Sequence, residues 1–134
     1  KVALMNAAQP MANDKFKGEL ISPRLQGAGQ VNVNNAANLK ASATDPSGNQ
    51  GSISLKTVGQ TTKFNVALTN QISEPLTYHI NTTNGPFTES RKTNNHNVGP
   101  VHDTAIPGAT LQSANDTVTV NPGKTQLVPF TLDI

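Results

Sequence analysis

The residues best suited to metal chemistry in this chain of 134 residues are His96, His102 and Asp103, which lie close together in the sequence. Imidazole nitrogens and carboxylate oxygens both bind zinc. However, the spacing from His96 to His102 fits neither a pair one helical turn apart nor a common loop site. The sequence also contains no calcium loop of the D-x-[DN]-x-[DN]-G type. We therefore expect exposed loop histidines here and no metal-binding residues.

A second candidate for ligand chemistry is the segment Gly27-Ala28-Gly29, which has the first two glycines of a dinucleotide-binding loop. The third glycine position of that motif is occupied by Asn32, and no strand is predicted before it. Two glycines also allow two backbone segments to pass closely, and this explanation is favoured. We expect no cofactor-binding residues.

Composition excludes several classes of function. Net charge is +2, aromatic residues are 4% and lysines and arginines form no run, so the basic patch and the stacking platform of a nucleic-acid-binding protein are missing. The absence of cysteine excludes disulfides, thiol catalysis and cysteine-ligated metals. No apolar run approaches the roughly 18 residues that span a membrane. A chain with 34% apolar and 13% charged residues, rich in Asn, Thr and Ser, suits a small β-sandwich with long loops.

The strongest periodicity lies in residues 61–83, where apolar residues occupy every other position on both sides of a polar break at 70–75. A period of two is typical of strands with one buried face. We predict two adjacent antiparallel strands at the centre of a mainly β, fibronectin-III or immunoglobulin-like antiparallel β-sandwich. His79 is out of phase with the apolar set and is expected to face solvent or a neighbouring module. The apolar positions are Phe64, Val66, Leu68, Leu76, Tyr78 and Ile80.

Further strands are predicted on both sides of this pair. Residues 51–56 alternate through Ile53 and Leu55 and are expected to form the first strand, after a linker over 41–51. Leu111 begins a short strand, residues 117–120 form another, and the sequence Asn-Pro-Gly-Lys at 121–124 predicts a turn. A last strand covers 126–134, and Pro129 marks it as an edge strand or the site of a bulge.

The first 39 residues and the segment 82–108 carry weaker signals. Residues 1–9 are apolar and rich in alanine, which predicts the tail of a buried helix that needs a surface to pack on. Residues 31–33 predict a short strand, followed by a helical turn capped by Asn34 or Asn35. Residues 82–108 lose all periodicity, and a structureless loop of this length is unusual unless it is functional or mobile.

These segments resemble a known family of proteases. "GAGQVNVNNAA" resembles the closing segment of subtilisin-like catalytic domains, and "KVALMNAAQP" is similar to the helix before it. Together with "SPRLQGAG" they resemble most the cell-envelope subtilases of Gram-positive bacteria, the lactocepin and C5a-peptidase group. Those enzymes continue into fibronectin-III-like modules, whose final strands "TVTVNPGKTQLVPFTLDI" resembles. The resemblance implies a catalytic-domain tail at 1–39 and a sandwich module at 40–134.

A subtilase needs Asp-[Ser/Thr]-Gly, His-Gly-Thr and Gly-Thr-Ser motifs, and the sequence has none of them. We therefore expect no catalytic residues in this chain, although the resemblance implies a parent serine endopeptidase that is extracellular and associated with the cell wall. Because the chain begins at Lys1, it is expected to be a piece of a longer polypeptide. The residues that fail the motif test are Asp14, Asp45, Asp103, Asp116, Asp133, His79, His96 and His102.

Two functions remain open. The first is a non-catalytic structural or spacer module that supports its own catalytic domain and neighbouring modules, and that contributes to the selection of protein substrates. The second is an adhesion or protein-binding module that uses the loop 82–108, with Arg91, Lys92 and His96. Under the first hypothesis, apolar residues of the segment 1–39 should be exposed, or be buried against a second copy, rather than pack on the chain's own sandwich. The positions named for this test are Val2, Leu4, Met5 and Phe16.

Overall fold

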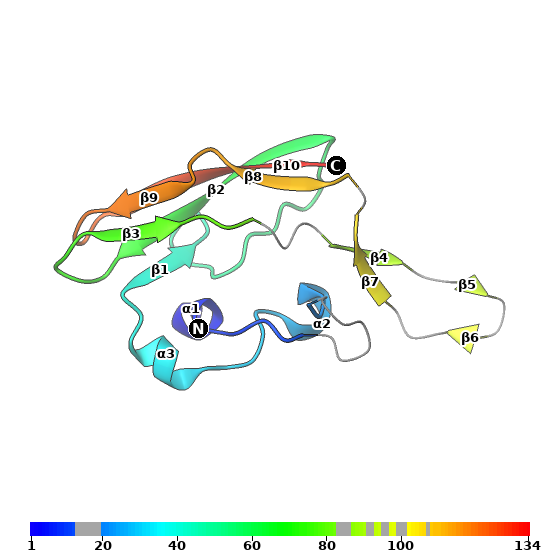
Figure 1. Cartoon of the computed structure of the whole chain (residues 1–134), viewed down its shortest axis with the longest axis horizontal. Coiled ribbons are helices and arrows are strands. Elements are labelled where there is room, and N and C mark those ends of the chain that lie inside the picture. The colour runs from blue at the N-terminus through cyan, green and yellow to red at the C-terminus, as the bar shows by residue number, and fades with distance from the viewer. Residues whose placement is uncertain (13–19, 83–86, 91–92, 95–96, 99–101, 107) are drawn as a thin grey trace.

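The described part of the chain folds into a β-sandwich with three short helices beneath it (Figure 1). This computed structural model describes residues 1–12, 20–82, 87–90, 93–94, 97–98, 102–106 and 108–134. The helices are α1 (Val2–Asn6), α2 (Pro23–Gln26) and α3 (Val33–Ala37). Across these described ranges no helix has the length and apolar character needed to cross a membrane.

The larger sheet has four antiparallel strands in the order β1-β2-β10-β8. Its long central strands β2 (Thr61–Asn70) and β10 (Thr125–Asp133) are flanked by β1 (Ala41–Thr44) and β8 (Thr110–Ser113). The register places Val66 opposite Val128 and Phe64 opposite Phe130. The second sheet pairs β3 (Leu76–His79) with β9 (Thr117–Val120). The mainly β fold class predicted from the sequence is confirmed.

The core lies between these two sheets. Val118 and Val120 of β9 are buried together with Val128 of β10, and Leu68, Ile80 and Phe130 pack around them. The rings of Phe64 and Phe130 stack with centroids 5.5 Å apart and planes 15° from parallel. Alternate residues of the two central strands therefore supply the apolar face, as the period of two predicts.

One part of the prediction for residues 61–83 is wrong, because β2 and β3 are not hydrogen-bonded neighbours but belong to different sheets. The Asn70 side chain, 1% exposed, explains the crossing. Its Nδ2 donates to the carbonyl oxygens of Glu74 at 2.7 Å and Val120 at 2.9 Å, and its Oδ1 accepts from the Ile72 amide at 2.9 Å. These bonds hold the connection in a bend that carries the chain from one sheet to the other.

Pro129 lies in the interior strand β10, so the prediction of an edge strand or bulge is wrong. Its position opposite Asn65 is in register with β2, and its carbonyl oxygen accepts from the Ala114 amide at 3.2 Å. The ladder between β10 and β8 begins only at Phe130. The missing N–H of proline therefore falls just beyond the end of β8, where no ladder bond is lost.

The first strand also lies elsewhere than predicted. Residues 51–56 form no strand, and β1 is built from residues 41–44, inside the segment expected to be a linker. β1 pairs with the end of β2, from Ala41 opposite Asn70 to Thr44 opposite Ala67. Its small side chains make a weak sequence signal, whereas Ile53 and Leu55 alternate but pair with no strand among the described residues.

Residues 31–33 are not a strand, as was predicted, but lead into α3. Asn32 caps this helix, because its Oδ1 accepts from the Asn35 amide at 2.9 Å. The cap is thus Asn32 rather than Asn34 or Asn35. An N-cap residue has extended backbone angles, which explains why this stretch resembles a strand in the sequence.

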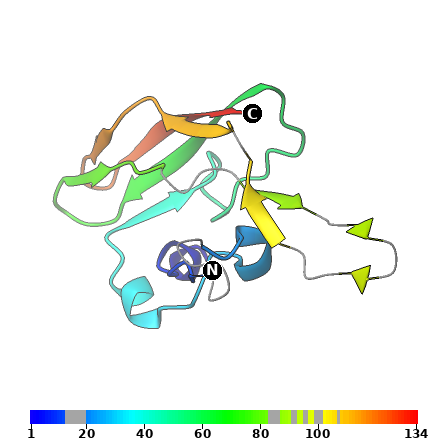
Figure 2. The same cartoon turned by 45° about the vertical axis from the view of Figure 1, so that its right-hand side comes forward.

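The segment 82–108 was predicted to lack regular structure, and its described residues contradict this. β4 (Phe87–Ser90) pairs with β7 (His102–Ala105), and β5 (Thr93–Asn94) pairs with β6 (Asn97–Val98). In Figures 1 and 2 these strands extend away from the sandwich. A two-stranded ribbon needs no buried face, so its sequence need not alternate.

Helix α1 is held against the outer edge of β1 by one side chain. Asn6 Nδ2 donates to the Ala43 carbonyl oxygen at 3.0 Å, and the Ala43 amide donates to Asn6 Oδ1 at 2.7 Å. The side-chain amide thereby makes the two bonds that a neighbouring strand would make. Gly51 lies beside the same helix, where an added Cβ would lie 3.1 Å from Met5 Sδ.

We predict that Asn70→Ala destabilises the chain by roughly 2–4 kcal/mol, since it removes one buried and two partly buried hydrogen bonds to backbone groups. Urea unfolding followed by circular dichroism would measure the change. Asn65→Ala, on the exposed face of the same strand, is the control and should change stability by less than about 0.5 kcal/mol. Equal unfolding midpoints for the two variants would contradict the role given to Asn70.

We also predict that Asn6→Ala frees α1 from β1. Loss of two partly buried hydrogen bonds costs about 1–3 kcal/mol locally, so the Ala43 amide should exchange with solvent about tenfold or more faster. Hydrogen exchange followed by NMR measures this directly. Asn35→Ala, exposed in α3, is the matched control. Unchanged protection of Ala43 in the Asn6 variant would show that α1 is held by other contacts.

Candidate functional surface

The described residues that looked capable of chemistry are engaged in local structural bonds. His79 is exposed on β3, as predicted, with Nδ1 3.3 Å from Thr117 Oγ1 on the neighbouring strand. The Thr61 hydroxyl donates to Asp133 Oδ1 at 2.6 Å, which joins the ends of β2 and β10. Within the described ranges, no three His, Cys, Asp or Glu residues are grouped as a metal site would need.

Asp45 organises the turn after β1. Its carboxylate accepts hydrogen bonds from the Ser47 hydroxyl at 2.5 Å and from the amides of Asn49 at 3.0 Å and Gln50 at 2.8 Å. The Ser47 bond and then the Gln50 bond lower the pKa of Asp45, because they favour its charged form. The contribution of this turn to stability is therefore present above the unfolded-state pKa and is lost as pH falls through the folded one. Asp45 fixes a loop and is surrounded by donors rather than by catalytic groups.

Several candidates lie where the structure describes no side chains. Asp14, Arg91, Lys92 and His96 are outside the described residues. His102 and Asp103 belong to β7, which is described only by its backbone and its pairing with β4. The hypothesis of a metal site at His96, His102 and Asp103 is therefore untested, and so is the role of the basic residues of 82–108.

The two glycines of the supposed dinucleotide loop have a structural explanation. An added Cβ at Gly29, whose φ is +113°, would lie 2.3 Å from the Gln9 carbonyl oxygen. Gln9 and Gln30 exchange backbone hydrogen bonds of 3.0 and 2.8 Å at this crossing. Gly27 follows α2 with φ +64°, which is typical of a helix end. Close approach of two backbone segments, as favoured from the sequence, is confirmed.

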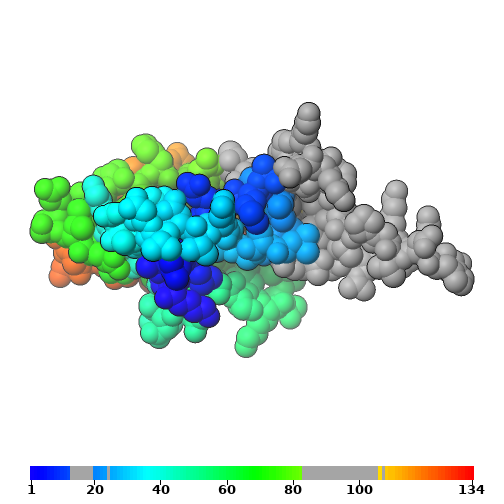
Figure 3. Space-filling view, turned by 90° about the horizontal axis from the view of Figure 1, so that it is seen from below, coloured from blue at the N-terminus to red at the C-terminus, as the bar shows by residue number. Residues whose placement is uncertain are grey.

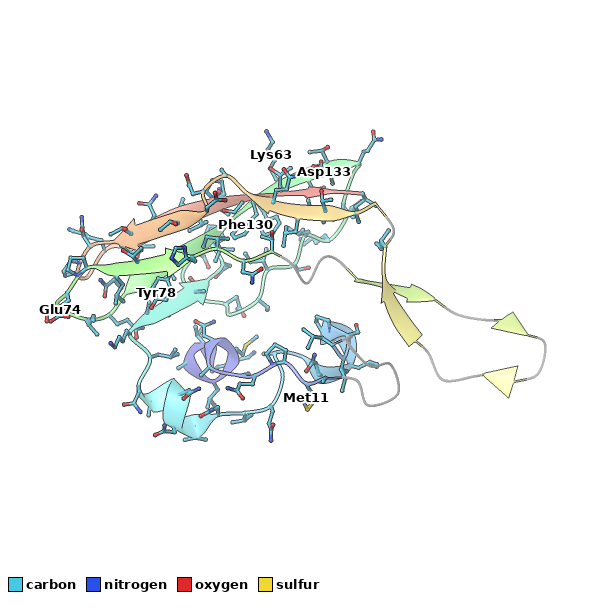
Figure 4. All side chains as sticks on the ribbon, in the orientation of Figure 1. Met11, Lys63, Glu74, Tyr78, Phe130 and Asp133 are labelled. Atoms are coloured by element: carbon cyan, nitrogen blue, oxygen red, sulfur yellow. The ribbon has the colours of Figure 1, made fainter. Side chains whose placement is uncertain are left out.

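The feature that stands out is an apolar surface on the N-terminal segment. Leu25, Val31 and Val33 are 60, 63 and 67% exposed, and Leu4 and Met11 are also exposed. These five residues are called the apolar surface below. The N-terminal segment covers one side of the sandwich in Figure 3, and Met11 points away from the sheets in Figure 4, on the opposite side from Lys63 and Asp133. Contiguous patches of exposed aliphatic residues are typical of surfaces that meet another protein unit, and these five residues are the candidates for such a patch on the N-terminal segment.

The exposure predicted for the segment 1–39 is confirmed in part. Leu4 is exposed, whereas Val2 and Met5 are half-buried and Phe16 lies outside the described residues. The expectation that the segment does not pack on its own sandwich is wrong for α1, which is bonded to β1 through Asn6. Sequence reasoning missed Leu25, Val31 and Val33, because their exposure depends on what lies beside them in space.

Comparison with known proteins gives these features a context. A family model described as an Fn3-like domain matches residues 53–134. The whole chain aligns over 143 positions with a PII-type proteinase of Lacticaseibacillus paracasei at 33% identity, and with a PII-type proteinase of Lactococcus lactis subsp. cremoris at 32%. A PIII-type proteinase of Lactococcus lactis subsp. cremoris (strain SK11) also aligns at 32%.

The chain spans only 7% of the length of each of these relatives. The alignments cover all of its residues, including the N-terminal helices outside the matched domain. They confirm the resemblance of this chain to a part of a proteinase. With its antiparallel sheets and the match to more than half of its residues, the chain belongs to the Fn3-like domain family.

Proposed function

We propose that this chain is a non-catalytic structural and spacer module of a subtilisin-like serine endopeptidase, extracellular and associated with the cell wall. In this proposal, residues 1–39 end the catalytic domain and residues 40–134 are the first fibronectin-III-like module. Its partners are the catalytic domain and the neighbouring modules of the same polypeptide. Alignment of the whole chain with a short part of large proteinases supports this assignment.

The observation that carries the proposal is the apolar surface. Full burial of a Val or Leu side chain contributes roughly 1.5–3 kcal/mol. Leu25, Val31 and Val33 are each at least 60% exposed, so covering these three contributes about 3–5 kcal/mol. That free energy is enough to hold a catalytic domain in one orientation on the module, so that the domain does not move freely on a flexible linker.

The other side of the same segment is bonded to the sandwich. Asn6 links α1 to β1, and β1 is in register with β2, the longest strand. A ten-residue strand is about 33 Å long. Residues 1–39 thus connect the apolar surface to a stiff sheet. This arrangement is consistent with a module that holds the catalytic domain at a fixed distance.

The test is to replace Leu25, Val31 and Val33 together by Ser in the parent proteinase. If a catalytic domain covers these residues, its thermal unfolding temperature should fall by several degrees, as expected for a loss of about 3–5 kcal/mol at the contact. Differential scanning calorimetry measures this. The same change in the isolated chain should leave its unfolding temperature within about 2 °C, since exposed side chains contribute little to stability.

Leu127→Ser is the matched control, because Leu127 is also exposed, at 46%, but lies on strand β10 and not on the N-terminal segment. It should leave the proteinase unchanged. An unchanged unfolding temperature for the triple variant as well would overturn the docking role of the apolar surface.

A second candidate function, protein binding through residues 82–108, is favoured by the paired strands that extend away from the sandwich. Loops and ribbons on a rigid sandwich commonly carry recognition. Under this alternative, replacing Arg91, Lys92 and His96 together by Ala should weaken binding of protein substrates about tenfold or more, as measured by surface plasmon resonance. A change in cleavage preference without a change in adhesion would instead place these residues in substrate selection by the proteinase.

A further inference from the structure

The edge of β3 that faces away from β9 has hydrogen-bonding groups without a neighbouring strand in the described part of the chain. The Ile80 amide donates to the Asp116 carbonyl oxygen at 2.8 Å, which continues the β3–β9 ladder as a hydrogen-bonded pair. Antiparallel pairs alternate between bonded and non-bonded, so Tyr78 is bonded to β9 while Thr77 and His79 are not. The N–H and C=O groups of Thr77 and His79 therefore point outward.

Side chains agree with this alternation. Non-bonded antiparallel pairs bring their side chains closest together. The hydroxyls of Thr77 and Thr119 lie 2.9 Å apart, and His79 Nδ1 lies 3.3 Å from Thr117 Oγ1. Both contacts are on the non-bonded pairs, as expected if the backbone of Thr77 and His79 faces the open edge.

The second sheet is also too small to cover the inner face of the first sheet. β2 and β10 have ten and nine residues, whereas β3 and β9 have four each. On the inner face of the larger sheet, Phe64, Phe130 and Leu132 remain only half-buried. Apolar side chains at a sandwich centre are normally covered by the opposite sheet. In the described part of the chain, the second sheet, with strands of four residues each, is too short to cover them fully.

The strand order indicates which strands would extend the second sheet. In immunoglobulin-like sandwiches one sheet has the order A-B-E-D and the other has C-F-G, lettered along the chain. The observed order β1-β2-β10-β8 corresponds to A-B-E-D, with β3 as strand C. Strands F and G of that arrangement follow strand E, here β10, and F pairs with C. β9 already occupies the other side of β3.

Strand direction allows this pairing. β2 is antiparallel to β10, and β3 follows β2 after the bend at Asn70, so β3 and β10 run the same way along the sandwich. In Figure 1 the C-terminus after β10 lies at the end of the sandwich toward which β3 points. A strand that turns back from this end runs antiparallel to β3.

We propose that the open edge of β3 binds an antiparallel β-strand supplied by the polypeptide that follows β10 in the parent protein. This strand bonds to the N–H and C=O groups of Thr77 and His79 and covers the inner face beside Phe64 and Phe130. The pairing completes the second sheet in the order β9-β3-F-G. It rests on the proposal that the chain is part of a longer protein, but it does not depend on the proposed contact with a catalytic domain.

Hydrogen exchange with mass-spectrometric detection tests the pairing in the parent proteinase and in the chain of residues 1–134. In the shorter chain the amides of Thr77 and His79 should exchange freely, while the Tyr78 amide, which is bonded to β9, is protected. In the parent, exchange at Thr77 and His79 should be about tenfold or more slower. Equal exchange of these two amides in both proteins would overturn the proposal.

A matched pair of substitutions removes one amide from each edge of this sheet. Thr77→Pro removes a donor from the proposed interface, and Thr119→Pro removes its cross-strand counterpart on the outer edge of β9. Both should be tolerated in the short chain. In the parent, Thr77→Pro should lower the unfolding temperature by several degrees more than Thr119→Pro. Equal effects of the two substitutions in the parent would refute the proposal. A dimer of the short chain that dissociates in the Thr77→Pro variant would also refute it, if the Thr77 and His79 amides exchange equally fast in the short chain and in the parent.

Discussion

The sandwich depends on the hydrogen bonds of one buried amide. Asn70 ends β2, bonds to the carbonyl oxygens of Glu74 and Val120, and accepts from the Ile72 amide. It thus joins the end of β2, the connection to β3 and the end of β9. Because β2 and β9 belong to different sheets, this single side chain sets how the two apolar faces meet. No aliphatic residue could do this, since it offers neither donor nor acceptor.

Strand positions with a strong alternation could be predicted from the sequence. The period of two at Phe64, Val66 and Leu68 and at Val118 and Val120 correctly identified β2 and β9 and their buried face. Alternation reports which side of a strand is buried but not which strand lies beside it. The sheet to which β3 belongs depends on Asn70, whose bonds reach as far as Val120, 50 residues away.

Other parts of the fold could not be predicted, for separate physical reasons. β1 consists of small residues whose strand conformation comes from pairing with the end of β2 rather than from their own preference. The exposed state of Leu25, Val31 and Val33 depends on what is beside them in space, and their sequence pattern contains no such information. The lack of the subtilase motifs can be seen in the sequence itself, because each motif consists of three consecutive residues.

The contact between Asn6 and Ala43 has a consequence for how such modules assemble. A strand added to a sheet satisfies one edge and creates another, so growth by strand addition has no natural end. A side-chain amide satisfies the same pair of backbone groups but presents no further edge. At Ala43 the edge of β1 is therefore closed, and a strand from another copy of the chain would find no free pair of backbone groups at that position.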